Sequence, residues 1–160
     1  NGVLFLYIPP FKNGVIYQSD VVSLTGFRTL SEEIFKTNLL KGAEILGQHR
    51  KRLKVLVDEK LSTYLSTKDT TLLVPFKFAN PATFDLLLLQ ENIKLGQRVE
   101  AFVLEYKEGS EWKTAASGST IGLKRLLRFP AVTASELRLK ITQSRLNPNL
   151  SEIGLYKMPK

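Results

Sequence analysis

The chain has 160 residues, 43% of them hydrophobic and 24% charged, a composition typical of a folded domain and not of a disordered or fibrous protein. It contains no cysteine and one histidine, His49, which excludes disulfides, thiolate zinc sites, cysteine nucleophiles and multi-histidine metal centres. The formal net charge of +8 predicts a basic surface that would attract anionic partners. No apolar run approaches the roughly 20 residues that cross a bilayer, so no membrane partner is predicted.

The N-terminal segment opens with a short apolar run. Residues 3–8 are rich in β-formers and end at Pro9-Pro10, before the turn signal Asn13-Gly14. A strand that is apolar on both faces is normally packed against other elements on both sides, so we predict that it belongs to a larger domain. Because the chain opens on Asn1 without a signal-peptide pattern, we interpret it as a piece of a longer protein.

A helix is predicted over residues 20–38. Ser19 or Asp20 is suited to cap its start, and apolar residues recur at spacings of three and four: Val21, Leu24, Phe27, Leu30 and Ile34. We expect this apolar face to pack against the helix's own protein, although a face for a partner is the alternative.

After Gly42 the pattern is that of an all-β sandwich or barrel. Strand-like runs separated by turn residues recur about every 8 to 12 positions, at residues 72–78, 84–89, 99–106, 121–129, 137–142 and 153–156. Alternation of apolar and polar residues over 137–142 predicts one buried and one solvated face. Gly109-Ser110 reads as a hairpin turn before a short strand at Trp112.

Several segments resemble α-L-fucosidases of glycoside hydrolase family 29, specifically their C-terminal region. The resemblance runs over residues 84–99 and 120–130, and its most specific parts are residues 90–98, which include Gln90-Glu91-Asn92 and Gly96-Gln97-Arg98, and residues 121–129. Residues 137–156 extend the resemblance. Upstream, Ile8-Pro9-Pro10 and Lys12-Asn13-Gly14 are similar to the exit from that family's catalytic barrel.

The resemblance implies a galactose-binding-like, discoidin-like jelly-roll β-sandwich. Residues 1–40 would end the catalytic barrel and provide a linker helix, and residues 41–160 would form the antiparallel sandwich. The parent enzyme would be a retaining α-L-fucosidase whose aspartate nucleophile and acid/base precede Asn1, so no catalytic residue is expected here. The family further implies an exported protein, whether periplasmic, secreted or lysosomal.

A calcium site is not expected, and no other cofactor is implied. Where the family commonly has an Asp-Gly-Asp turn, this chain reads Asp58-Glu59-Lys60. Calcium in related sandwiches is held by oxygen ligands near that turn. Loss of the glycine and of the second aspartate, with a lysine gained, argues against the ion.

Four residues are candidates for carbohydrate binding. Tyr64 and Trp112 could stack on a sugar ring, while Arg145 and Asn147 could bind its hydroxyl groups. The competing interpretation, which we favour, is that both aromatics cap the core and Arg145 pairs with an acid.

Two basic clusters could bind a polyanion such as a sulfated glycan or a nucleic acid. They are His49, Arg50, Lys51, Arg52 and Lys54, and Lys124, Arg125 and Arg128. Aromatics are not interleaved with them, so we expect solvated faces and no nucleic-acid partner. No glycine-rich phosphate motif supports a nucleotide cofactor.

The sequence therefore predicts a noncatalytic C-terminal accessory region of an α-L-fucosidase-like glycoside hydrolase. Its partner would be its own catalytic barrel. An autonomous carbohydrate-binding module that holds fucosylated or galactosylated glycan is the alternative, and a basic polyanion-binding domain ranks below both.

Overall fold

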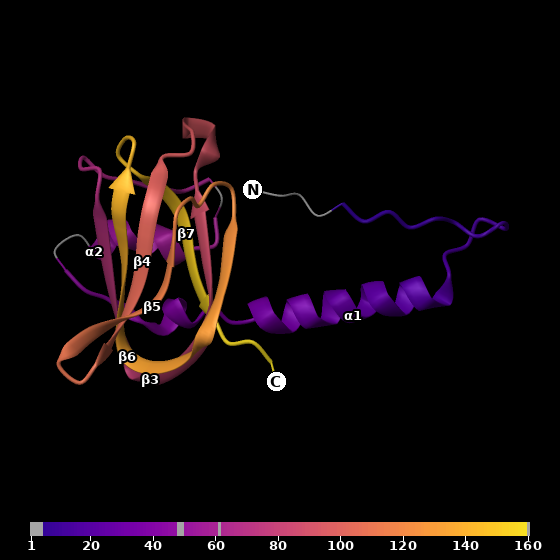
Figure 1. Ribbon diagram of the computed structural model, residues 1–160, viewed down its shortest axis with the longest axis horizontal. Coiled ribbons are helices and arrows are strands. Elements are labelled where there is room, and N and C mark those ends of the chain that lie inside the picture. Colours follow the sequence, from indigo (N-terminus) through magenta and orange to yellow (C-terminus); the bar gives the residue numbers. More distant parts are fainter. Residues whose placement is uncertain (1–4, 48–49, 61, 160) are drawn as a thin grey trace. The chain divides into compact units, whose positions relative to one another are not determined.

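A computed structural model describes residues 5–47, 50–60 and 62–159 (Figure 1). Predictions made for Val3, Leu4 and His49 lie outside the described residues. The described residues divide into two compact units, one of residues 38–158 and the other of the segment that ends at Thr37, together with Pro159. Each unit is described by itself.

The helical unit contains the helix α1, Gln18–Phe35. Before it, the Phe11 amide donates to the Val15 carbonyl at 2.7 Å and closes a turn around Gly14. The predicted strand is not observed in residues 5–8, which are not paired with any described strand. The cap prediction was also wrong: the N-cap residue is Tyr17, which makes no side-chain cap bond, and Asp20 lies in the first turn, where it complements the helix dipole.

The other unit is mostly β-structure. Its strands are β1 Glu44–Ile45, β2 Leu65–Ser66, β3 Leu72–Glu91, β4 Val99–Glu108, β5 Glu111–Gly118, β6 Arg125–Ser144 and β7 Asn149–Tyr156. The short helix α2, Arg50–Leu53, and three 3₁₀ turns connect them: η1 Leu39–Gly42, η2 Lys54–Val57 and η3 Ile93–Leu95.

Two long strands, β3 and β6, join the two layers of an antiparallel sandwich. Each is 20 residues long, and the strand order is β2-β7-β3-β6-β4-β5, with β1 on β3. Residues 72–77 of β3 lie between β1 and the end of β6, which pairs with β4 on its other side. Residues 86–91 lie between β7 and the start of β6. The same two strands therefore serve both sheets.

The core lies between the layers and follows the alternation in the sequence. Leu137, Leu139 and Ile141 are at most 1% exposed, whereas Arg138 and Lys140 between them face outward. Phe76, Phe84 and Phe102 fill the centre and are also at most 1% exposed. Burial of these large side chains is the main stabilising contribution to the sandwich.

The predicted all-β sandwich with a preceding helix is confirmed, but its strands are longer than predicted. Residues 72–78 and 84–89 belong to one strand, β3, and the strand predicted at 121–129 begins only at Arg125 and continues to Ser144 as β6. The turn at Gly109-Ser110 is confirmed, and Gly109 takes a φ of 60° there.

Asn38 ties the start of the sandwich unit to β7, and we expect Asn38→Ala to lower the unfolding free energy by about 2 kcal/mol. Its Oδ1 accepts from the amides of Leu40 and Leu155, both at 3.1 Å, and its Nδ2 donates to the Ile153 carbonyl at 3.1 Å. The side chain is buried, so alanine would leave these backbone groups without a partner. Urea unfolding measures the loss, with the exposed Asn80→Ala as control. Equal stabilities of the two variants would contradict the assignment.

Candidate functional site

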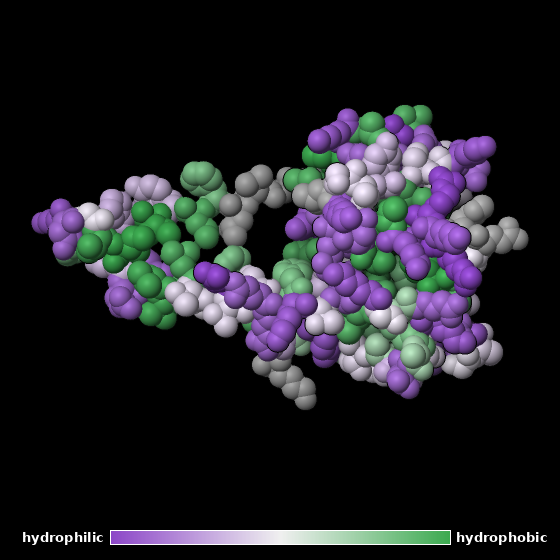
Figure 2. Space-filling view, turned by 180° about the vertical axis from the view of Figure 1, so that it is seen from behind, coloured by the Kyte–Doolittle hydropathy of each residue, from purple (hydrophilic) through white to green (hydrophobic). Residues whose placement is uncertain are grey.

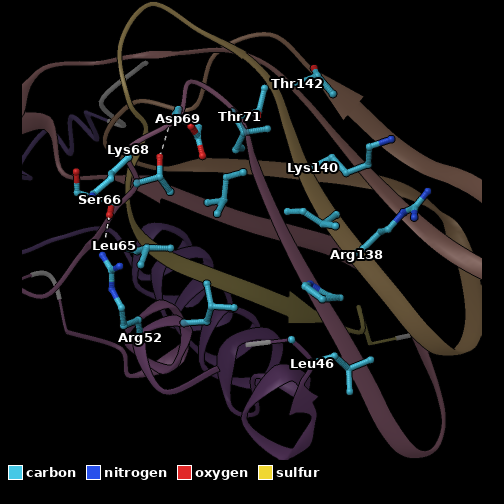
Figure 3. Close-up of a pocket in the computed structure, with 17 residues that line it drawn as sticks. Leu46, Arg52, Leu65, Ser66, Lys68, Asp69, Thr71, Arg138, Lys140 and Thr142 are labelled. Carbon is cyan, nitrogen blue, oxygen red and sulfur yellow. Dashed lines mark hydrogen bonds between the residues drawn. The ribbon is translucent and has the colours of Figure 1, made fainter. Parts of the chain in front are cut away.

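A groove of about 1000 Å³ lies against β3 and the end of β6 (Figure 3). Its rim is formed by the segment after β1, by α2, by β2 and by the loop of residues 67–71 that leads into β3. The amide of Leu46 donates to the Pro75 carbonyl at 3.0 Å, which holds that part of the rim on the sheet. We call this the β3–β6 groove.

The lining of the β3–β6 groove divides into an apolar wall and a polar rim. Aliphatic side chains make the wall: Leu46, Leu53, Leu65, Leu72, Leu73, Pro75 and Ile141. Hydroxyl groups come from Ser66, Thr67, Thr71 and Thr142. Four cations, Arg52, Lys68, Arg138 and Lys140, stand against one carboxylate, Asp69, so the groove carries positive charge.

Two of the cations belong to the outer face of β6 and are held by β4. Arg138 Nε donates to one oxygen of Glu105 at 2.5 Å, and Lys140 Nζ to the other at 3.4 Å. Burial alone would raise the pKa of Glu105, but these hydrogen bonds and charges outweigh it and lower the pKa below its usual value. Both cations therefore have fixed positions.

The other two cations lie at the opposite rim. One Nη of Arg52 donates to the Ser66 carbonyl at 3.1 Å, which Figure 3 shows as a dashed line. Lys68 makes no ion pair with any described residue. Thr67 Oγ1 donates to the Asp69 carbonyl at 2.7 Å and shapes the loop that carries Lys68.

Arg145 and Asn147, two of the sequence-predicted sugar ligands, lie at one end of β4 and make internal contacts. Arg145 Nε donates to Glu100 at 2.7 Å, so this arginine does pair with a neighbouring acid. Asn147 Oδ1 accepts from Arg98 at 3.0 Å, and its Nδ2 donates to Ser66 Oγ at 2.7 Å. Their role in sugar binding stays a prediction.

Trp112 lies far from that end. It pairs with Lys107 of β4. Lys107 is eight residues from Val99, so Trp112 lies about 25 Å from the Val99 end of β4 at the usual rise per residue. The guanidinium of Arg138 covers one face of its ring, 4.0 Å from the centroid. Tyr64 is 42% exposed and directly precedes β2, near Asn147. None of the four predicted ligands lines the groove, and Trp112 cannot share one monosaccharide with Arg145.

Two carboxylates are buried where β3 and β7 pair. Glu91 accepts three backbone hydrogen bonds, from Arg98, Val99 and Gly122, at 2.8 to 3.0 Å. Glu152 accepts one, from Glu59 at 3.0 Å, and its Oε1 contacts no described hydrogen-bond donor. Burial, with the nearby carboxylates of Asp58 and Glu59, raises the pKa of Glu152 to about 7. It is 5% exposed and does not line the groove, so substrate would not reach it.

The turn at Asp58-Glu59-Lys60 is closed by its own side chains. The Asp58 carboxylate accepts from the Lys60 amide and from Thr63 Oγ1, both at 2.9 Å. Glu59 has a φ of 60°, the left-handed conformation that glycine adopts at little cost. No three acidic or histidine side chains among the described residues are grouped to hold a metal ion.

The sequence does not predict the groove: it places Arg52 in a basic cluster and assigns no binding role to Lys68, Arg138 or Lys140. The available signal was the polar run Ser66-Thr67-Lys68-Asp69-Thr70-Thr71 between two strands, which is typical of a loop that carries binding groups.

No helix in the described part of the chain is long and apolar enough to cross a membrane.

No family model matches the chain. Among curated proteins, α-L-fucosidase 1 of Arabidopsis thaliana is 33% identical over 168 residues, which cover 98% of this chain and 33% of that protein. A solved structure of a Ruminococcus gnavus family 29 fucosidase in complex with fucose is 27% identical, with a TM-score of 0.83 over 96% of this chain and 33% of that one. The chain spans about a third of the length of these relatives.

Two further structures define the fold. A Bacteroides thetaiotaomicron protein assigned to the α-L-fucosidases has a TM-score of 0.91 and 28% identity over 99% of this chain and 37% of its own. The CBM32 domains of Clostridium perfringens ZmpB, at 20% identity and a TM-score of 0.59 over 73% of this chain and 34% of that one, share the fold. Over nearly its whole length, the chain is homologous to a domain-sized part of the α-L-fucosidases of glycoside hydrolase family 29.

Proposed function

We propose that this chain is the noncatalytic accessory region of an α-L-fucosidase-like glycoside hydrolase, joined to a catalytic barrel through its helical unit. The observation that carries the proposal is the exposure of apolar side chains in that unit. Among the described residues, nineteen large hydrophobic side chains are exposed, and twelve of them lie between Phe5 and Phe35. No residue of α1 is buried. Figure 2 shows hydrophobic side chains on the surface of this unit.

The distribution of these residues around α1 supports a docked helix. Val21, Val22 and Phe27 are 38%, 62% and 55% exposed. At about 100° per residue they lie roughly 100° to 140° apart around the helix axis, so exposed apolar side chains are present on several sides of α1. A helix that is apolar on several sides is normally buried. The relatives are about three times as long as this chain, so a larger body of the same polypeptide is the natural cover.

The carboxylates of the sandwich support a noncatalytic role. Retaining glycosidases need two carboxyl groups that flank the substrate about 5 Å apart. Glu91 is saturated by backbone amides, Glu105 is paired with cations, and Glu152 is shut off from the groove.

An autonomous carbohydrate-binding module is the second candidate, which the fold shared with CBM32 domains favours. Export of the whole protein is part of the proposal and rests on the family resemblance alone.

The test compares the 160-residue chain with the longer protein encoded by its reading frame. We expect the chain alone to release no fucose from an aryl α-L-fucoside, and the longer protein to release it. In the longer protein, Val22→Asp with Leu30→Asp should make the junction at least tenfold more sensitive to thermolysin, because the charges would oppose burial of α1.

Thr70→Asp with Ser119→Asp, at exposed polar positions of the sandwich, is the matched control and should leave cleavage unchanged. Fucose release by the 160-residue chain would refute the noncatalytic role. Equal protease resistance of both double variants would refute docking through α1.

A further inference from the structure

We infer that the β3–β6 groove binds an anionic saccharide, one that carries sulfate or carboxylate groups. This inference goes beyond the proposed accessory role and does not depend on how α1 docks. It would also assign a function to the net charge of +8, which the family resemblance does not require.

The shape and size of the groove suit a ligand larger than one sugar. Its volume of about 1000 Å³ lies at the upper end of the range for small-molecule sites, about 300 to 1,000 Å³. The apolar wall accommodates the C–H faces of sugar rings, and the hydroxyl groups of the rim can exchange hydrogen bonds with sugar hydroxyls. No aromatic side chain is among the described lining residues, so ring stacking does not supply the affinity.

The charges of the groove supply that affinity instead. Arg52 and Lys68 lie on one side of the groove, and Arg138 and Lys140 lie on the other (Figure 3). With the lining carboxylate of Asp69 and the carboxylate of Glu105 that pairs with Arg138 and Lys140 included, these groups carry a net charge of +2. Glu105 fixes Arg138 and Lys140, and the Ser66 carbonyl fixes Arg52, so little side-chain entropy is lost when an anion binds.

Arg52 and Lys68 are the residues left free to contact the ligand. Arg52 has five N–H donors, of which one contacts Ser66, and its planar group suits sulfate and carboxylate. Neither Arg52 nor Lys68 pairs with a described carboxylate. A sugar is favoured over a nucleic acid, because base stacking needs aromatics that the described lining residues do not supply.

The experiment is a calorimetric titration of the 160-residue chain with a heparin-derived tetrasaccharide, which carries sulfate and carboxylate. Its desulfated form, inorganic sulfate and neutral chitotetraose are the other probes. We expect saturable binding of the heparin tetrasaccharide, weaker binding of the desulfated form, none of chitotetraose, and loss of affinity as NaCl increases from 50 to 300 mM.

Arg52→Gln with Lys68→Gln should weaken binding at least tenfold. Lys94→Gln with Lys124→Gln removes the same charge at exposed positions outside the groove and should change affinity less than twofold. Circular dichroism verifies that both variants fold. Absence of saturable binding would overturn the inference, as would equal weakening in the two variants, or equal affinity for a single-stranded DNA 12-mer or for anionic phosphatidylserine vesicles.

Discussion

Glu91→Gln is expected to lower the free energy of unfolding by about 3 kcal/mol, a large fraction of the usual total of about 5 to 15 kcal/mol. Glu91 is 2% exposed at the end of β3. Its Oε1 accepts from the amides of Arg98 and Val99 at 2.9 and 3.0 Å, and its Oε2 from Gly122 at 2.8 Å. One carboxylate thus joins β3 to the start of β4 and to the loop before β6.

Glutamine cannot replace this carboxylate, although it has nearly the same shape. Its amide has one acceptor oxygen and one NH₂ group, so at least one backbone N–H would face another donor. The bonds lost are bonds to a charged group, which contribute about 1.5 to 3 kcal/mol each. Destabilisation therefore follows from hydrogen-bond polarity and not from a cavity.

Urea unfolding at pH 7 measures the effect on Glu91→Gln. Glu111→Gln, at an exposed position of β5, is the control and should stay within about 0.5 kcal/mol of the wild type. If Glu91→Gln unfolds at the same urea concentration as the control, the carboxylate does not hold these three segments together.

The sandwich could be predicted because apolar residues alternate where one face is buried, as in residues 137–141. The length of β3 could not, because Asn80-Pro81 has the composition of a turn. The register of β3 on β6 shifts between Lys77 and Ala82, and this irregularity lets the strand pass a proline that lacks an N–H donor. Pro130 in β6 lies in a similar irregular stretch, between the pairs Leu86–Arg128 and Phe84–Val132.

The groove was beyond sequence reasoning for a different reason. Arg138 lies opposite Pro75, and Lys140 opposite Leu73, so its walls meet only through the pairing of segments more than 60 positions apart. That register depends on the whole sheet. Likewise, Glu91 follows an apolar run and Glu152 interrupts one, so in the sequence both resemble residues at exposed strand ends. In the structure the loop at Gly122 covers Glu91, and the turn at Glu59 covers Glu152.

Glu152→Gln is expected to remove a pH dependence of stability between about pH 4.5 and 7. The pKa of Glu152 is raised to about 7, chiefly by burial and further by the nearby carboxylates of Asp58 and Glu59. The hydrogen bond from the Glu59 amide and the charge of Lys41 lower the pKa but do not outweigh these effects. Tyr156 lies four residues along the same strand, and its pKa is raised to about 12 by burial and by the charges of Glu152 and Glu59. The uncharged acid is thus the form that the fold prefers.

The sign of the effect follows from proton linkage. Between pH 4.5 and 7 the folded chain keeps the Glu152 proton, whereas the unfolded chain releases it. The stabilisation is fully present below about pH 4.5 and is lost as the pH rises through 7, by up to about 3 kcal/mol for a shift of this size. Glutamine is neutral at every pH, and its carbonyl can still accept from the Glu59 amide.

Urea unfolding at pH 4.5, 6.0 and 7.5 tests this prediction. The stability of Glu152→Gln relative to the wild type should increase by about 3 kcal/mol from the lowest to the highest pH. Glu111→Gln should show no such increase, and the contribution of His49 cancels because all variants contain it. Asp85 and Glu105, whose pKa values are lowered, lose their contributions only at more acidic pH. Parallel pH profiles for Glu152→Gln and the wild type would mean that Glu152 is ionised in the folded protein, with its charge compensated inside the sandwich.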